Sequence, residues 1–446
     1  MARTSLSCFA LIALALCSLS VTQAPLACSP SETPQAIYAA DPQDPWNRIF
    51  FFLFTRRVQI RMSDEFPEAA PFLDNPGNQT LPSVSSRTFD RLEWGDRAID
   101  PLYYPFRHSP EGRRYMYLEP TYAQFTDALQ DALRETSPRS PIARVLMQND
   151  LWAAYDLLHD PLFPQDRTEV LTSRRQRTLD LLAQLIRKLA LTPSEINALP
   201  QNYSLAQQRN SLPDLFNAQS GWIEIGWFPG RQHDAAAGYR CFTRIFLKPA
   251  HPPRNLKRFL NSLPDSTEDL STQIDGLALV MQLLLIDSRG RVTPSPLVTD
   301  VQLRLFPKSN DSLSQKALIR VCELSRKLML DDPSSGGLSA EKEDSPAYLG
   351  GLSFASPQFD NPRSEPGPPI LVRLRTRCIS CHGADLKQVQ TFAIARPPQF
   401  HPPPVRVLNP ESSEAAKFSL EQQTKSATFQ QLQGYFRAAR APLLVH

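Results

Sequence analysis

Two cysteines and a histidine near the C-terminus constrain this chain more than any other feature of its sequence. Cys378, Cys381 and His382 stand in the pattern C-x-x-C-H. With 7 Cys and 7 His in 446 residues, random placement would give about 0.002 such patterns, so the spacing needs a chemical explanation. A redox-active thiol pair or half of a zinc site are two alternatives. Neither of them explains the histidine, and the chain has no second C-x-x-C.

Covalent attachment of haem explains all three residues. Two thiols at this spacing can form thioether bonds with the two vinyl groups along one edge of a haem, and the next residue can then ligate the iron. Residues 373–383 resemble the haem-binding segment of c-type cytochromes, and the resemblance is limited to this segment. It implies one haem c, attached to Cys378 and Cys381, with His382 as an axial ligand of the iron.

The second axial ligand of the iron is a separate question. Small c-type cytochromes usually supply a Met several dozen residues after the motif, but this chain has no Met after Met329. His401 follows His382 by 19 residues, and we predict that it folds back over the other haem face. The alternatives are an open position, a Met, or a histidine from elsewhere in the fold, namely His108, His159, His233, His251 or His446.

The N-terminus is typical of an export signal. Arg3 precedes an apolar stretch of 13 residues, 9–21, which is too short to span a membrane as a helix. Small residues follow, and we predict residues 1–27 as a signal peptide. Residues 26–28 resemble a bacterial lipoprotein box, in which Cys28 would carry the lipid. The alternatives are ordinary signal-peptidase cleavage and an uncleaved anchor.

Export and covalent haem support each other, because bacteria attach haem c outside the cytoplasmic membrane. We therefore predict a protein of the periplasm or the outer cell surface, held at the membrane surface by a lipid on Cys28. Disulfides persist in such a compartment, so a bridge between Cys241 and Cys322 is predicted. The alternative is two buried thiols that behave as small apolar side chains.

Composition divides the mature chain into four regions. Residues 28–44 are polar and contain Pro, as a tether would. Residues 45–215 open with an apolar run assigned to the core and continue with helical spacing of apolar side chains. Residues 216–369 alternate like strands, and residues 370–446 hold the haem segment and a helical tail. This organisation predicts an α+β fold with a helical N-terminal part, a β-rich middle and a small, mainly helical haem-attachment region.

Periodicity also predicts individual elements. Helices are expected over 120–134, 141–159, 166–190, from 193 onward, and over 411–439. Strands are expected over 221–228, 239–247, 277–286 and 300–306. Residues 317–330 and 370–375 fit either type, and residues 63–117, rich in Pro, Asp and Gly, predict irregular structure.

Charge and motifs narrow the function. The balance of 48 basic and 45 acidic residues gives a net charge of +3, which argues against a nucleic-acid-binding surface. The sequence has no phosphate-binding glycine loop, zinc-protease motif or serine-hydrolase motif. We predict electron transfer by one haem c to a redox partner protein. The alternatives are a peroxidase-like haem enzyme with an open sixth iron position, and an interaction protein in which the haem is structural.

Overall fold

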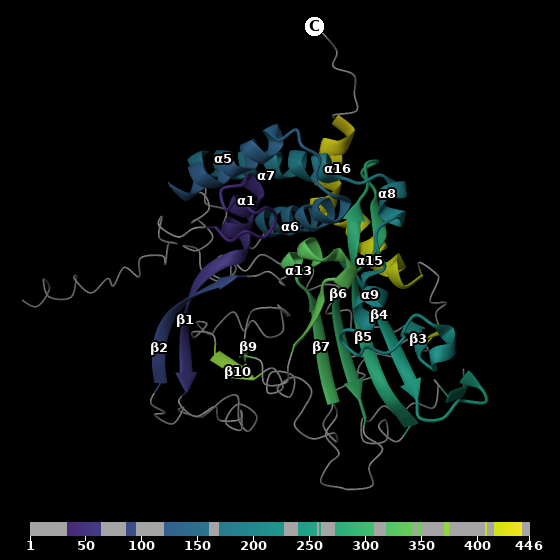
Figure 1. Ribbon diagram of the computed structural model, residues 1–446. Helices are drawn as coiled ribbons and strands as arrows, with labels where there is room; N and C mark the ends of the chain where they lie inside the picture. Colours follow the sequence, from purple (N-terminus) through teal and green to yellow (C-terminus); the bar gives the residue numbers. More distant parts are fainter. Residues whose placement is uncertain are drawn as a thin grey trace, which may run out of the picture.

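Helices and two β-sheets make up the protein, which confirms the predicted α+β class (Figure 1). Within the described residues, no helix is long and apolar enough to cross a membrane. The structure is a computed structural model, and it describes residues 34–63, 86–94, 120–159, 169–226, 240–256, 258–259, 273–306, 318–341, 346–349, 370–373, 406–407 and 414–438.

The larger sheet is antiparallel throughout, and its strands lie in the order β11-β3-β4-β5-β6-β7-β8. At its centre, β5 (Ile274–Ile286) pairs with β4 (Cys241–Pro249) and β6 (Val292–Leu305). β5 is buried at every position except Asp275. Both faces of this strand are covered, which explains why its sequence is an almost continuous apolar run. The other strands are β3 (Ile223–Gly226), β7 (Leu318–Leu324), β8 (Leu338–Glu341) and β11 (Arg406–Val407).

The smaller sheet has the strand order β2-β1-β10-β9. β1 (Thr55–Ser63) and β2 (Ser86–Trp94) pair antiparallel along their whole length, and β1 pairs parallel with β10 (Ile370–Arg373). β10 also pairs with β9 (Pro346–Leu349). The prediction of irregular structure is therefore wrong for β2. Charged residues occupy many positions of β1 and β2 and obscure their alternation, so pairing between the strands decides their conformation.

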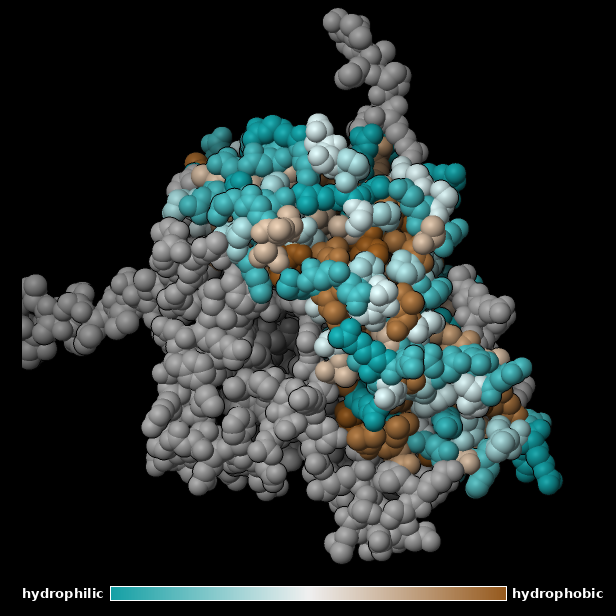
Figure 2. Space-filling model, viewed as in Figure 1, coloured by the Kyte–Doolittle hydropathy of each residue, from teal (hydrophilic) through white to brown (hydrophobic). Residues whose placement is uncertain are grey.

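The long helices form a layer that shares one apolar core. α1 is mostly buried, so the apolar run at the start of the fold belongs to the core, as predicted. Ile286, at the end of β5, joins the same core and connects the layer to the larger sheet. Figure 2 shows mostly hydrophilic residues over α5 and α7, and hydrophobic residues at the level of α6 beneath them. The layer consists of α1 (Pro45–Phe54), α5 (Thr121–Arg134), α6 (Pro141–His159), α7 (Glu169–Leu189) and α16 (Ala427–Ala438).

Short helices build a second core against the larger sheet. α8 begins as predicted, because Thr192 forms a capping box with Glu195 and Pro193 occupies the first turn. The short helices of this core are α8 (Pro193–Asn197), α9 (Asn202–Gln207) and α13 (Arg326–Asp331). The chain also forms two 3-10 turns, η1 (Ala218–Ser220) and η2 (Pro333–Ser335).

Two segments that the sequence pattern did not divide each contain two elements in the structure, with a serine between them. Residues 317–330 contain both β7 and α13, and the Ser325 side chain between them accepts a hydrogen bond from the Leu328 amide at 3.0 Å. The helical tail divides at Ser426 into α15 (Glu414–Lys425) and α16. α15 packs on β4 and β6, and α16 joins the helical core, so the tail closes both halves of the fold. The domain boundaries given above stay predictions.

Candidate functional site

The predicted haem segment links the two sheets. The described chain leaves the smaller sheet after β10 and enters the larger sheet at β11, so residues 374–405 connect them. Within the part of the chain that the structure describes, no group of three or more His, Cys, Asp or Glu could hold a metal ion. The predicted haem residues Cys378, Cys381 and His382, the predicted ligand His401 and the predicted lipid site Cys28 lie outside the described residues.

The predicted disulfide between Cys241 and Cys322 is wrong. Both side chains are buried, and no disulfide joins them. Cys241 lies on β4 and Cys322 lies on β7, with β5 and β6 between them. Three strand spacings of about 4.8 Å put their Cα atoms at least about 14 Å apart, roughly twice the reach of a disulfide. The structure therefore supports the alternative of two buried thiols.

His159, the last residue of α6, has a ring nitrogen that the protein leaves unused. Its Nε2 is buried and forms no hydrogen bond. The ring packs against that of Tyr155, one helical turn earlier, with the centroids 4.7 Å apart. Burial, and secondarily the positive charge of Arg175, lower the pKa of His159 from 6.5 to about 4. At neutral pH the imidazole is therefore uncharged and can offer a lone pair to a metal.

Two further aromatic side chains of α6 share this property. The Trp152 Nε1 and the Tyr155 hydroxyl are also buried and form no hydrogen bond. Trp152, Tyr155 and His159 follow one another at intervals of three and four residues, so they lie along one face of the helix. We call these three residues the α6 aromatic face. A buried polar atom without a partner costs about 1–3 kcal/mol, and buried side chains elsewhere in the described fold, among them Asn149 and Gln423, carry such atoms as well.

Cationic side chains lie near the C-terminal end of this face. Arg175 donates a hydrogen bond from Nε to the carbonyl of Leu158, at 2.8 Å. Arg240, just before β4, is buried and pairs with Asp156 of α6 at 2.9 Å. Asp156 lies three residues before His159, so Arg240 reaches the same end of the helix. Burial and then Tyr435 raise the pKa of Tyr155 above its usual value, so its hydroxyl stays protonated.

A second polar cluster, nearer the middle of α6, is complete in itself. Asp150 and Arg326 are both buried, and Arg326 Nη2 lies 2.5 Å from Asp150 Oδ1. The Tyr38 hydroxyl donates to the other carboxylate oxygen, also at 2.5 Å. The Arg326 guanidinium stacks on the ring of Phe54, 4.5 Å from its centroid. Each charge finds its partner inside the protein, so we regard this cluster as structural.

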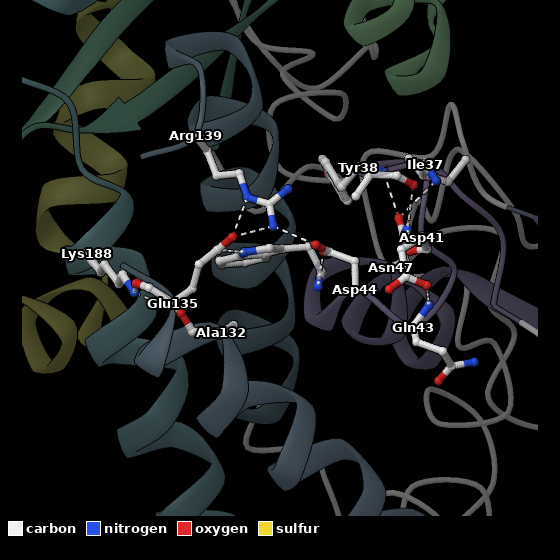
Figure 3. Close-up of polar contacts among 12 residues, drawn as sticks. Ile37, Tyr38, Asp41, Gln43, Asp44, Asn47, Ala132, Glu135, Arg139 and Lys188 are labelled. Carbon is white, nitrogen blue, oxygen red and sulfur yellow. Dashed lines mark hydrogen bonds and ion pairs between the residues drawn. The ribbon is translucent and has the colours of Figure 1, made fainter. Parts of the chain in front are cut away.

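Part of the predicted tether belongs to the folded body (Figure 3). The buried Asn47 side chain forms four hydrogen bonds with backbone groups of residues 34–44, two as acceptor and two as donor. Arg139 joins Asp44, at 2.6 Å, to Glu135, at 2.8 Å. These contacts fasten the segment to α1 and to the connection between α5 and α6.

The larger sheet holds one more buried ion pair. Arg244 of β4 grips Glu224 of β3 with two hydrogen bonds, of 2.9 and 2.5 Å. Its guanidinium also stacks on Phe216, 4.5 Å from the ring centroid. The two parallel hydrogen bonds neutralise both charges inside the protein and so offset the cost of removing them from water.

Sequence reasoning named His159 only among several histidines that could reach the iron, and it did not name Trp152 or Tyr155 as site residues. Their spacing along a predicted helix was a usable signal, but their burial and unused polar atoms emerge only from the fold. Comparisons of the chain with protein-family models, with curated proteins and with solved structures found no match.

Proposed function

We propose that the protein is an exported, monohaem c-type cytochrome-like electron carrier. The observation that carries this proposal is the C-x-x-C-H pattern of Cys378, Cys381 and His382 in a chain that begins with an export signal. Each of the two features is expected if the other is correct, because covalent haem attachment takes place outside the cytoplasm. A redox partner protein would exchange the electrons.

The chain's own residues would have separate roles toward the haem. Cys378 and Cys381 would hold it by thioether bonds, and His382 would ligate its iron. Bound haem supplies reversible one-electron transfer at the iron. The α6 aromatic face does not present surface for such a group, because Trp152 and Tyr155 are fully buried in the helical core.

Staining for haem after denaturing electrophoresis tests the covalent attachment. The protein is exported in cells that mature c-type cytochromes, and the stained band is expected to survive denaturation. Cys378→Ala and Cys381→Ala are each expected to weaken or abolish it, because each removes one thioether. Cys322→Ala is the matched control, since this buried cysteine lies outside the motif, and it is expected to retain the stain. An unstained wild-type band would refute the proposal.

The spin state of the oxidised iron distinguishes a carrier from a haem enzyme. Two strong-field axial ligands give low-spin iron, as expected for electron transfer. A high-spin spectrum would instead favour the peroxidase-like alternative with an open sixth position. The measurement uses the same purified holoprotein as the staining experiment.

We also propose that a lipid on Cys28 holds the folded body close to the membrane surface. The described body begins at residue 34, so only five residues separate it from Cys28. The six steps from Cys28 to residue 34 span at most about 20 Å when the chain is fully extended. Cys28→Ala is expected to move the protein from the membrane fraction to the aqueous fraction without loss of haem. Retention of the variant in the membrane fraction would contradict the lipid anchor.

A further inference from the structure

β8 lies at one end of the larger sheet. Among the described strands it pairs on one side only, with β7. The Ser325 amide donates to the Gly337 carbonyl at 3.0 Å, so these two residues form a hydrogen-bonded pair. Such pairs alternate along antiparallel strands, and the backbone groups of Leu338 and Ala340 therefore face away from β7. Groups on the outer side of an edge strand can pair with another extended chain unless the protein covers them.

The Asn210 side chain lies against this outer side of β8. Its Nδ2 donates a hydrogen bond to the Leu338 carbonyl oxygen at 3.0 Å, and its Oδ1 accepts one from the Ala340 amide at 3.2 Å. A neighbouring strand would present the same kinds of group, an amide donor and a carbonyl acceptor, to these two positions. The carboxamide of Asn210 therefore takes the place of a paired strand.

The turn that follows α9 holds Asn210 in this position. The backbone amide of Asn210 donates to the Ala206 carbonyl oxygen at 3.0 Å, and Nδ2 donates to the same oxygen at 3.1 Å. Ser211 has a φ of +50°, and it is the only non-Gly residue with a positive φ among the described residues. Arg320 of β7 donates to the Ser211 carbonyl oxygen at 3.0 Å. The turn is therefore fastened to α9 on one side and to the sheet on the other.

We infer that Asn210 fastens this turn over the edge of β8 and thereby prevents a second copy of the chain from pairing there. The partner is the same edge of the other copy, because the outward groups of Leu338 and Ala340 complement one another. With Leu338 opposite Ala340 of the second copy, each residue exchanges both backbone hydrogen bonds with the other, about a two-fold axis at Ser339. The inference does not depend on the proposed haem.

Sedimentation equilibrium of the full-length exported protein tests the inference. Every sample carries Cys28→Ala, so that a lipid cannot cause association. The mass of Asn210→Ala is expected to rise with concentration toward about twice that of the otherwise unchanged protein, and to do so at lower concentration when Arg320→Ala releases the turn as well. Asn210→Asp keeps the acceptor for the Ala340 amide and loses the donor, so it is expected to associate more weakly and serves if Asn210→Ala does not fold.

Asn217 offers a matched control. Its side chain also acts as donor and acceptor, to Asp214 and to the Gln219 amide, and both bonds lie within residues 214–219, away from β8. Asn217→Ala is therefore expected to keep the mass of the otherwise unchanged protein. Far-ultraviolet circular dichroism establishes that each variant in the comparison is folded.

Two changes within β8 distinguish edge pairing from association that follows partial unfolding. Ala340→Pro removes the outward N–H and leaves the hydrogen bonds between β8 and β7 in place, so it is expected to restore the original mass in the Asn210→Ala background. Ser339→Cys in the same background is expected to form an intermolecular disulfide, because the two copies of residue 339 face each other across the axis. The background with Ser339 retained controls for the other cysteines.

Three results would overturn the inference. The first is an unchanged mass at every concentration in the folded Asn210 variants, with and without Arg320→Ala. The second is association that Ala340→Pro does not reverse, or that Asn217→Ala shows to the same extent. The third is an associated Ser339→Cys variant that forms no intermolecular disulfide, which would place the contact between copies away from β8.

Discussion

Asp150 shows how strongly a single residue can depend on its partners. Its carboxylate is buried between the Tyr38 hydroxyl and the Arg326 guanidinium. Asp150→Asn removes the negative charge and leaves Arg326 buried without it, so we expect a loss of about 3–5 kcal/mol in the free energy of unfolding. Tyr38→Phe removes one hydrogen bond to a charged group, so we expect a loss of about 1.5–3 kcal/mol. Urea denaturation measures both values.

The exposed ion pair of the neighbouring helix provides the control. Lys327 and Asp331 lie 2.8 Å apart on α13, and both side chains are at least half exposed. Solvent screens this pair, so Lys327→Ala is expected to change the free energy of unfolding by less than about 1 kcal/mol. If Asp150→Asn cost no more than Lys327→Ala, the buried network would not contribute as the structure indicates.

The sequence supports a proposal about chemistry where that chemistry depends on local spacing, and not where it depends on tertiary distance. Haem attachment could be proposed because Cys378, Cys381 and His382 are neighbours in the chain, and it stays a prediction. The Cys241–Cys322 bridge was predicted from compartment and cysteine number, which say nothing about strands that separate two residues. His159 was one histidine among many until the fold showed its buried, unmatched nitrogen.

At the level of elements, the turn between β5 and β6 depends on its contact with α16. Gly290 has a φ of +74°, and a Cβ at this position would lie 3.0 Å from the Cβ of Phe436 on α16. Gly290→Ala therefore meets backbone strain and a clash together, and we expect it to lower the free energy of unfolding by about 1–3 kcal/mol. Thermal unfolding followed by circular dichroism measures the effect.

Gly434 is a matched control on the helix that Gly290 contacts. It lies within α16, and a Cβ there would meet nothing within 4 Å. Ala is the better helix former by about 1 kcal/mol, so Gly434→Ala is expected to stabilise the protein. A lower free energy of unfolding in Gly290→Ala together with a higher one in Gly434→Ala would support the packing of the hairpin on α16. Destabilisation by both changes would argue against it.

Elements with strong periodicity were predicted well, and those that depend on pairing were not. The helices α5, α6 and α7 agree with the predicted ranges to within a few residues. The expected strand over 300–306 is part of β6, which begins at Val292. Pro294 and Pro296 argue against a strand at its start, but the pairing with β5 is irregular there, between Gln282 and Leu284, and tolerates them.

At the scale of the whole molecule, the C-terminal helix α16 packs in the same core as the first helix, α1. Phe429, Leu432 and Phe436 of α16 complete the core formed by α1, α5, α6 and α7, and α15 packs on the larger sheet. The tail that follows the predicted haem segment therefore contacts both the helical layer and the sheet. Composition could place this tail in a separate C-terminal region, because sequence distance says nothing about which core an amphipathic helix completes.

This arrangement predicts that the helical layer and the sheet unfold together. Phe429 is almost fully buried, and its ring centroid lies 6.1 Å from that of Trp152. Phe429→Ala is expected to lower the free energy of unfolding by about 3–5 kcal/mol. With Trp94, Trp222 and Trp227 replaced by Phe, tryptophan fluorescence follows the helical core through Trp46 and Trp152. Far-ultraviolet circular dichroism follows helices and sheet together. Both probes are expected to shift by the same amount in urea, as one cooperative transition requires.

An exposed apolar residue provides the control for Phe429→Ala, because truncating it removes side-chain area without opening a cavity in the core. Val170 of α7 is 59% exposed, and Val170→Ala is expected to change the free energy of unfolding by less than about 0.5 kcal/mol. A shift of the fluorescence transition in Phe429→Ala without a shift of the dichroism transition would mean that α16 supports only the helical layer. The regions predicted from the sequence, 216–369 and 370–446, would then unfold independently. Coincident shifts would instead establish that α15 and α16 hold the two halves of the fold together.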